Sequence, residues 1–430
     1  MKILLIKPKW YVKGGPYRYT ETIRFPPVNL GVIAALSKGH FVKLIDEDEE
    51  EIIYSKNWDL VGITVVTFTF QAAFKIADRF KKLGVKVVLG GVHATLKPQD
   101  CLKHADAVVV GEAENVWSKL LRDLEKNKLK KIYKSKELVN MDDVPMPDNS
   151  LYPYKYTFGA IQTSRGCTNT CKFCYLRSMP WKKFRHMSVN RAIKEMKRVK
   201  QKYLIFSDDN MFLDREYCLE LFKAMRPLKK LWWSQAPVNI GLDEELLQAM
   251  KKSGCYCVAI GFQTVNQDSA DWVKIRQNKV IQYKKIVSNL HKYKIMVQSY
   301  FMLGFDYDKK DVFKKTTQMI KDIDLDDAYL YIVTPYPGTE LYNKYEKEER
   351  IITKDLKKYG WYNATFKPKH MTPKELEQGI KDAYKEINLH FIKQLPRKTL
   401  FWWKLSLKHP YLAKVIMKGQ LRKVDVTKLP

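Results

Sequence analysis

The sequence lacks a long apolar run, an acidic surplus and an even set of scattered cysteines, and each absence excludes a class of protein. No stretch of the 430 residues reaches the ~20 apolar residues that a membrane-spanning helix needs. Pro8 cuts the first apolar run short, so we expect no secretory segment. The seven cysteines are odd in number and three fall between positions 167 and 174, which argues against a disulfide framework and favours a reducing, cytoplasmic location.

Basic residues are abundant, with 77 Lys and Arg against 47 Asp and Glu and a formal net charge of +30. Such an excess indicates a negatively charged partner: nucleic acid, anionic lipid or an acidic substrate. Residues 393–430 contain ten Lys and Arg, one acid and an aromatic cluster at 401–403. This tail has two interpretations, a basic frayed terminus or an amphipathic element on an anionic surface. The second predicts peripheral contact with the inner face of the membrane.

The first third of the chain alternates short apolar runs with segments of helical periodicity, a pattern typical of βαβ units on a parallel sheet. The expected strands are residues 2–6, 41–45, 60–64, 85–89 and 107–110, and the expected helices are 30–37, 71–83 and 114–124. Several strands end in glycine or small polar residues, at the edge where a doubly wound sheet binds its ligand. Taken singly, each of these glycines is explained by a tight strand-to-helix turn.

Proline and aspartate residues at 141–153 break the periodicity, and βα alternation then resumes. Six further strands are expected at 160–164, 203–207, 231–235, 257–262, 296–303 and 328–332. Six parallel βα units predict a partial or complete barrel with its chemistry at the carboxyl ends of the strands. The predicted fold class is therefore α/β, in four parts: a Rossmann-like domain (1–140), a linker (141–158), a (β/α)6 TIM-type barrel (159–345) and a C-terminal helical extension (346–430).

Three cysteines are crowded into the loop that follows the expected strand 160–164: Cys167, Cys171 and Cys174. Thiolates at this spacing can converge on one metal centre. Three ligands rather than four leave one iron of a four-iron cluster open for a substrate or cofactor. A structural zinc site is the alternative, but it requires a fourth Cys or His, and His186 is the only candidate close in the sequence.

The segment Ser164-Arg165-Gly166-Cys167 and the residues up to Tyr175 resemble the cluster loop of the radical S-adenosylmethionine (SAM) enzymes. Segments 206–210, 260–264, 302–305 and 334–339 are similar to the ends of later barrel strands in that family, in the family's order. The resemblance implies that Cys167, Cys171 and Cys174 hold a [4Fe-4S] cluster. It also implies that six further residues contact SAM or surround the cluster: Phe173, Tyr175, Ser207, Asp208, Gln263 and Gly304. Gln263 departs from the family pattern, because many relatives carry an acidic residue at that position.

The N-terminal third is similar to the cobalamin-binding domain that precedes this barrel in one large subfamily. Segments 26–31, 59–64, 90–95 and 110–114 follow in family order. The resemblance implies a cobalamin site made by Thr64, Gly90, Gly91, His93, Gly111 and Glu112. None of the eight histidines sits in an Asp-x-His-x-x-Gly arrangement, so we expect cobalamin to bind without a protein histidine on cobalt.

The implied enzyme is a cobalamin-dependent radical SAM methyltransferase. In that family a 5′-deoxyadenosyl radical made from SAM at the cluster activates an unactivated carbon, which most often receives a methyl group. A small molecule, natural product or lipid of isoprenoid type is the implied substrate, and a reductase with flavodoxin or a ferredoxin the implied electron donor. No catalytic side chain is assigned.

Other functions remain open. Some relatives form rings or C–C and C–O bonds on lipids without methylation. A tRNA-modifying radical enzyme of the methylthiotransferase kind suits the basic charge, but needs three further N-terminal cysteines where this chain has only Cys101. A carrier of metal or cobalamin would not need six barrel strands. We do not expect a nucleic-acid partner.

Overall fold

The computed structural model describes residues 1–9, 24–152 and 156–408, with side chains described as far as Phe391 in the last helix. The chain forms two compact units, each treated by itself. The first contains the N-terminal strand together with residues 25–168 and 176–213. The second contains residues 169–175 and 214–408.

The first sheet has six parallel strands in the order β2-β1-β3-β4-β5-β6. In chain order they are β1 (Lys2–Lys7), β2 (Phe41–Asp46), β3 (Leu60–Thr64), β4 (Lys86–Gly90), β5 (Ala107–Val110) and β6 (Ile132–Lys134). The helices are α1 (Val28–Leu36), α2 (Phe70–Lys82), α3 (Val92–Leu96), α4 (Pro98–Leu102) and α5 (Trp117–Glu125). The strand order reverses between β1 and β3, which makes this a doubly wound sheet.

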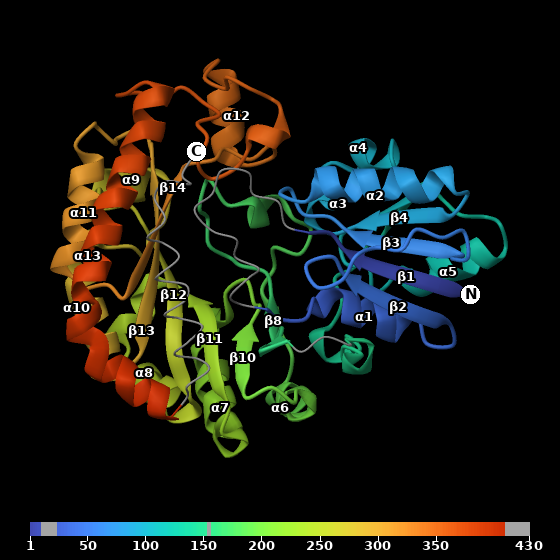
Figure 1. The fold of residues 1–430 in the computed structure, drawn as a ribbon, viewed down its shortest axis with the longest axis horizontal. Helices are drawn as coiled ribbons and strands as arrows, with labels where there is room; N and C mark the ends of the chain where they lie inside the picture. Colours follow the sequence, from blue (N-terminus) through green and yellow to red (C-terminus); the bar gives the residue numbers. More distant parts are fainter. Residues whose placement is uncertain (10–23, 153–155, 409–430) are drawn as a thin grey trace. The chain divides into compact units, whose positions relative to one another are not determined.

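Helices cover both faces of the first sheet, with α2 on one face and α1 on the other (Figure 1). Alternate residues of a strand point to opposite faces, so Leu4 and Ile6 pack with the α2 side while Ile3 and Leu5 pack with the α1 side. Burial on both faces explains why these strands are near-continuous apolar runs.

The second sheet has six strands in the order β14-β13-β12-β11-β10-β7, with parallel pairing throughout the registers observed. They are β7 (Phe158–Ile161), β10 (Tyr203–Phe206), β11 (Leu231–Ala236), β12 (Cys255–Gln263), β13 (Met296–Leu303) and β14 (Asp327–Ile332). The main helices are α6 (Val189–Arg198), α7 (Arg215–Met225), α8 (Glu244–Ser253), α9 (Gln267–Trp272), α10 (Tyr283–Lys292), α11 (Val312–Asp322), α12 (Glu340–Lys347) and α13 (Pro373–Lys408). Spatial order follows chain order, so the predicted partial (β/α)6 barrel is confirmed.

The sequence predictions of strands hold with shifts of one or two residues, apart from one wrong segment and two short strands, β6 and β9 (Arg185–His186), that were not predicted. The expected strand 160–164 is wrong: β7 ends at Ile161, and Ser164–Arg165 forms a separate strand, β8, antiparallel to β9 (Arg185–His186). The sixth strand of the first sheet, β6, was not predicted. It is three residues long and only its central Tyr133 is buried, so it carries little apolar signal.

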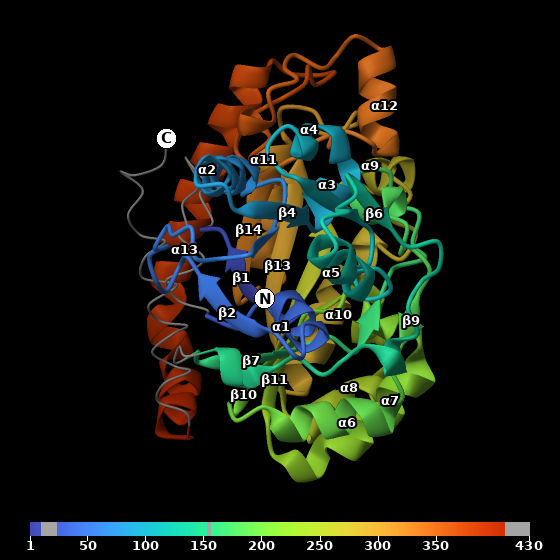
Figure 2. The same cartoon turned by 90° about the vertical axis from the view of Figure 1, so that its right-hand side faces the viewer.

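The last described helix, α13, runs beside α11 and the edge strand β14 in the second unit (Figures 1 and 2). The predicted membrane-binding tail, 393–430, lies outside the residues whose side chains are described. Among the described residues, no helix has the length and apolarity needed to cross a membrane.

We predict that Tyr384→Phe destabilises the second unit. Strand β14 lies at the sheet edge, and the Tyr384 hydroxyl of α13 accepts a 2.8 Å hydrogen bond from the Leu330 N–H. Its loss leaves a buried donor unsatisfied, at a cost of about 1–3 kcal/mol in the free energy of unfolding. Denaturant unfolding measures this, with Tyr307→Phe at an exposed ring as control. Equal midpoints for both variants would contradict the prediction.

Candidate functional site

Small polar groups lie at the carboxyl edge of the first sheet, beside the reversal between β1 and β3. Thr64 ends β3, and its Oγ1 accepts a 2.9 Å hydrogen bond from the side-chain amide of Asn29 in α1. Asn29 is exposed and Thr64 partly so, which leaves their polar groups accessible to a ligand at this edge. The sequence prediction included Thr64 but missed Asn29, whose only signal was its place in the segment 26–31.

The turn after β4 requires glycine. Gly91 has φ +101°, and a Cβ there would lie 2.9 Å from the backbone oxygen of Val65. The hydroxyl of Thr95 donates to the Gly91 oxygen at 2.9 Å and accepts from the Gly111 N–H at 3.0 Å. These two bonds join the loops after β4 and β5, so Gly90, Gly91 and Gly111 offer partly exposed backbone without side chains along one edge.

His93, the next predicted residue, lies in the core. Its ring is 2% exposed and stacks on Phe70 at 5.1 Å between ring centroids, with Phe74 at its edge. Burial lowers the pKa of His93 to about 4, so the imidazole is neutral near pH 7. The residue therefore packs α2 against the loop after β4. The expectation that no histidine binds cobalt stays a prediction.

Glu112 is also engaged within the protein. Both of its carboxylate oxygens accept hydrogen bonds from Arg185, and the N–H of Val139 donates to Oε2 at 3.0 Å. Arg165 donates to Oε1 at 3.0 Å. Burial alone would raise the pKa of Glu112, but the hydrogen bond from Arg185 and the charge of Arg165 outweigh it and lower the pKa. Glu112 is thus a carboxylate that holds other side chains.

Asp208, at the end of β10, holds the chain where it leaves β7. Its carboxylate accepts from the Thr163 N–H at 3.1 Å, the Thr163 hydroxyl at 2.7 Å and the Ser164 hydroxyl at 2.6 Å. Burial raises the pKa of Asp208 to about 6 in spite of these three bonds. Thr163 and Ser164 are diverted to this carboxylate, which explains why β7 stops at Ile161. The neighbouring Ser207 bonds back to the Ile161 oxygen through its N–H and hydroxyl.

Polar side chains that follow β10 also fix the backbone that leads to Cys167. Asp209 accepts from the Gly166 N–H at 2.8 Å, and the side-chain amide of Asn210 lies 3.9 Å from the Cys167 sulfur. Gly166 has φ +88°, and a Cβ there would clash with the backbone oxygen of Lys183. Aspartate and asparagine after β10 therefore fix the backbone from which the first cysteine projects.

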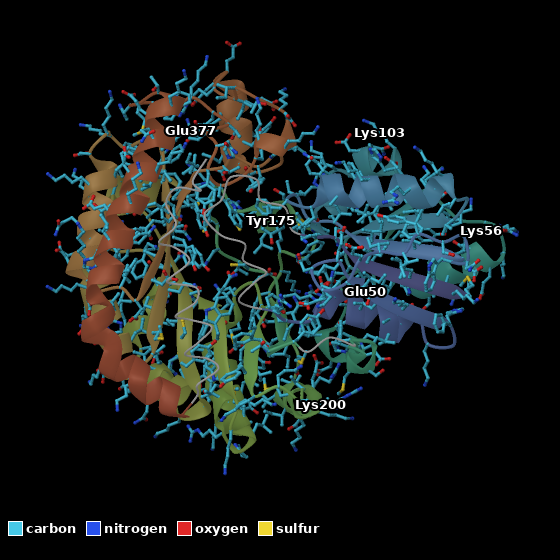
Figure 3. The ribbon with its side chains drawn as sticks, viewed as in Figure 1. Glu50, Lys56, Lys103, Tyr175, Lys200 and Glu377 are labelled. Carbon is cyan, nitrogen blue, oxygen red and sulfur yellow. The ribbon has the colours of Figure 1, made fainter. Side chains whose placement is uncertain are left out.

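The second half of the cysteine loop belongs to the second unit. The Lys172 N–H donates to Val273 and the Lys172 oxygen accepts from Leu341, both at 3.0 Å, which ties the loop to the ends of α9 and α12. The Phe173 ring lies 6.1 Å from that of Phe305. Tyr175, labelled in Figure 3, is 37% exposed and opens a short 3-10 turn.

Two further predicted SAM contacts of the second unit, Gln263 and Gly304, lie at the end of β12 and just after β13. Gln263 has φ +66°, a strained conformation for a residue with a side chain, and strain of this kind concentrates at functional sites. The N–H groups of Gly304 and Phe305 both donate to Asp308 at 3.0 Å. Burial raises the pKa of Asp308 to about 6.

The donor set of the loop suits an iron–sulfur cluster. All seven cysteines lie in the described part of the chain and none forms a disulfide. Cys171 is buried, and Cys167 and Cys174 are partly exposed. Across the ranges that the structure describes, no three Cys, His, Asp or Glu side chains are grouped as metal ligands, so the assignment of these cysteines stays a prediction. Cys218 and Cys255 are buried in the core.

An aromatic wall in the second unit was not predicted. It consists of Tyr300, Tyr329, Tyr331, Trp361 and Tyr362. Tyr331 is central, with ring centroids 6.0 Å from Tyr300, 4.9 Å from Trp361 and 5.9 Å from Tyr362. Tyr300 and Tyr331 are partly exposed and alternate along β13 and β14 with buried residues. Tyr300 and Tyr331 therefore share the face of the sheet opposite the fully buried Phe301 and Leu330.

Comparisons with known proteins match both halves of the chain. The sequence model of the B12 binding domain matches residues 25–121, and that of the Radical SAM superfamily matches residues 161–320. The bacteriochlorophyllide d C-12(1)-methyltransferase of Chlorobaculum tepidum is 31% identical over 87% of this chain and 86% of its own. The bacteriochlorophyllide d C-8(2)-methyltransferase of the same organism is 27% identical over 86% of this chain and 87% of its own.

The fold is shared with a solved structure of the same kind. The radical SAM methyltransferase TsrM from Kitasatospora setae, with cobalamin and a [4Fe-4S] cluster bound, superposes with a TM-score of 0.64. The match covers 81% of this chain and 78% of TsrM at 15% identity, so it concerns the fold. A doubly wound B12-binding sheet followed by a partial radical SAM barrel defines the class of protein.

The chain belongs to the cobalamin-dependent radical SAM methyltransferases. Membership implies a [4Fe-4S] cluster, SAM and cobalamin as cofactors, as the sequence predicted. The carrier interpretation is therefore wrong. The zinc-site alternative for the three cysteines is not favoured by this family, and their assignment as cluster ligands stays a prediction.

We predict that Gly91→Val lowers cobalamin occupancy about tenfold and leaves the iron content unchanged. A valine at this positive φ costs about 1–2 kcal/mol in backbone strain, and its Cβ also clashes with the backbone oxygen of Val65. Absorbance of bound cobalamin after reconstitution measures the loss. Gly39→Val is the matched control, since Gly39 has φ +93° but no atom within 4 Å of its Cβ position. Equal losses in both variants would mean that general destabilisation is the cause.

Proposed function

We propose that the protein transfers a methyl group to an unactivated carbon of a planar, conjugated ring substrate of tetrapyrrole type. When bound, the cluster and SAM supply a carbon-centred radical that removes a hydrogen, and cobalamin supplies the methyl group. The chain's own task is to bind, orient and exclude water. The choice of this substrate class rests on the aromatic wall.

We propose that Cys167, Cys171 and Cys174 hold the cluster, with Asp208, Asp209 and Asn210 fixing the backbone on the Cys167 side. Three thiolates in one loop suit iron, and the anchoring bonds at both ends of the loop support this assignment. We place SAM near Phe173, Tyr175, Ser207, Gln263 and Gly304 by resemblance to the family. The strained backbone of Gln263 adds support.

We propose that cobalamin lies on the loops after β3, β4 and β5, over Thr64, Gly90, Gly91 and Gly111. Asn29 adds an accessible amide to this set. Backbone at these positions is partly exposed and carries no side chain at the glycines, which suits close approach of a large, flat ring. We assign His93 and Glu112 to the support of these loops, because packing and ion pairs engage their side chains.

We expect the triple variant C167A/C171A/C174A to lose its iron and to stop cleaving SAM to 5′-deoxyadenosine, because no other thiol of the loop remains to bind iron. Cobalamin uptake should persist, since its predicted site lies on other loops. Iron analysis, cobalamin absorbance and chromatography of SAM products measure the three quantities. Cys218→Ala, at a fully buried thiol of α7, is the control. A four-iron cluster in the triple variant would refute the assignment.

The aromatic wall favours a planar ring over an aliphatic lipid. Stacked aromatic pairs contribute about 0.5–1.5 kcal/mol beyond the burial of their area, a gain that saturated chains do not share. The wall also carries polar groups: Gln298 donates to the Tyr329 hydroxyl at 3.2 Å and accepts from the Tyr300 hydroxyl at 3.1 Å. Two of the relatives above are named for methylation of bacteriochlorophyllide, which supports the same class.

We expect Tyr331→Leu to bind a water-soluble chlorin about tenfold more weakly than the unchanged protein, because the central ring of the wall is lost. Quenching of chlorin e6 fluorescence by the cofactor-loaded protein measures the affinity. Tyr256→Leu, at the amino end of β12 in the same sheet, is the control. Tighter binding of a polyisoprenoid than of chlorin, or no effect at Tyr331, would return the substrate to the lipid class predicted from the sequence.

Peripheral contact with an anionic membrane stays a prediction of the basic tail. It is independent of the substrate class, because a hydrophobic ring compound and an isoprenoid both reside near membranes. The tRNA-modifying alternative is not favoured by the family to which the chain belongs.

A further inference from the structure

Four charged side chains of the first unit form one buried network, made by Glu112, Glu114, Arg165 and Arg185. Arg165 bridges the two acids, with Nη1 at 3.0 Å from Glu112 and Nη2 at 2.7 Å from Glu114. Arg185 approaches Glu112 at 2.8 Å. The side chains are 5–14% exposed, and two positive charges balance two negative ones.

Backbone groups tighten the network. The Arg185 guanidinium donates to the Val139 oxygen at 2.6 Å, while the Val139 N–H donates to Glu112 at 3.0 Å. Arg165 also donates from Nε to the side-chain oxygen of Gln162 at 2.8 Å. Burial would lower the pKa of Arg165, but Glu114 and Glu112 outweigh it and raise the pKa, so the pairs stay ionised at neutral pH. Bidentate guanidinium contacts of this kind fix orientation as well as charge.

The network joins two loops that are far apart in the sequence. Glu112 follows Gly111 directly and Glu114 comes two residues later, in the loop at the carboxyl end of β5 where Gly111 belongs to the proposed cobalamin site. Arg165 stands two residues before Cys167, and it pairs with Arg185 in the short antiparallel ladder β8–β9. A shared set of ion pairs therefore holds the loop of the proposed cobalamin site and the strand that leads to Cys167.

We infer that Glu112, Glu114, Arg165 and Arg185 are positioning residues that fix the spacing between the cobalamin loop and the cluster loop. The inference rests on the proposed function, because it presumes that both cofactors bind at these loops. A network that served stability alone could be broken with no change in the spacing of the cofactors. If the network sets the spacing, breaking it changes the interaction between the two cofactors even when both are fully bound.

The test uses Glu112→Gln, which keeps the shape of the side chain and removes its charge, in protein loaded with both cofactors. The reduced cluster and cob(II)alamin are both paramagnetic, so the cluster speeds the spin relaxation of the cobalt signal to a degree set by their separation. We expect Glu112→Gln to keep the iron and cobalamin contents of the unchanged protein. The cluster's enhancement of cobalt spin relaxation should be lost in this variant or spread over a wider range of rates. With substrate, 5′-deoxyadenosine formed per methylated product should rise about tenfold.

Glu195→Gln is the matched control. The Arg191–Glu195 pair lies in α6 of the same unit, at 3.0 Å and with side chains 12% and 6% exposed, and its contact is made within one helix rather than between the two loops. We expect it to lower thermal stability to a similar extent and to leave the spin relaxation unchanged. Glu114→Gln, which removes one contact of Arg165, replaces Glu112→Gln if that variant does not fold.

Two results overturn the inference, and they are distinguishable. Unchanged relaxation in Glu112→Gln or Glu114→Gln, with both cofactors bound, would make the network a purely structural one and leave the proposed function intact. Uptake of a cluster but no cobalamin by the unchanged protein would overturn the proposed function together with the inference.

Discussion

The buried carboxylate of Asp208 determines where the chain leaves the second sheet. Strands β7 and β10 are paired in parallel, so the residues after Ile161 and after Phe206 emerge side by side. Asp208 accepts three hydrogen bonds from Thr163 and Ser164, one of them from the Thr163 N–H, a backbone donor that the sheet would otherwise have to satisfy. Burying a charge is costly unless it is well bonded, and these bonds offset part of that cost. The cysteine loop thereby begins from a fixed backbone.

The same constraint operates at the edge of the first sheet, where parallel strands also bring their carboxyl ends together. There the joining groups are the Thr95 hydroxyl, which links the loops after β4 and β5, and the Glu112 carboxylate, which links β5 to β8 and β9. Irregular loops at both edges are thus held by buried polar side chains from neighbouring strands. Cofactor enzymes need this rigidity, because the protein contributes chiefly position and exclusion of water.

Much of the fold was predictable because burial on both faces makes parallel strands continuous apolar runs that alternate with amphipathic helices. The strand 60–64 was predicted to the residue, as was 296–303. The error at 160–164 has a local cause, since Thr163 and Ser164 look like strand residues but are bonded to Asp208. His93 resembled a ligand in the sequence, yet its ring stacks on Phe70 in the core.

The sequence by itself determined the class of fold, the order of the strands' polar ends and the spacing of Cys167, Cys171 and Cys174, because each depends on neighbours within about ten residues. Only the tertiary structure decided which polar ends meet. Arg165 and Glu112 are 53 residues apart, and Leu330 and Tyr384 are 54 apart. Such pairs form because strand order and helix packing bring them together, and local sequence spacing carries no record of either. The aromatic wall follows the same rule, since its rings come from two strands and a later loop.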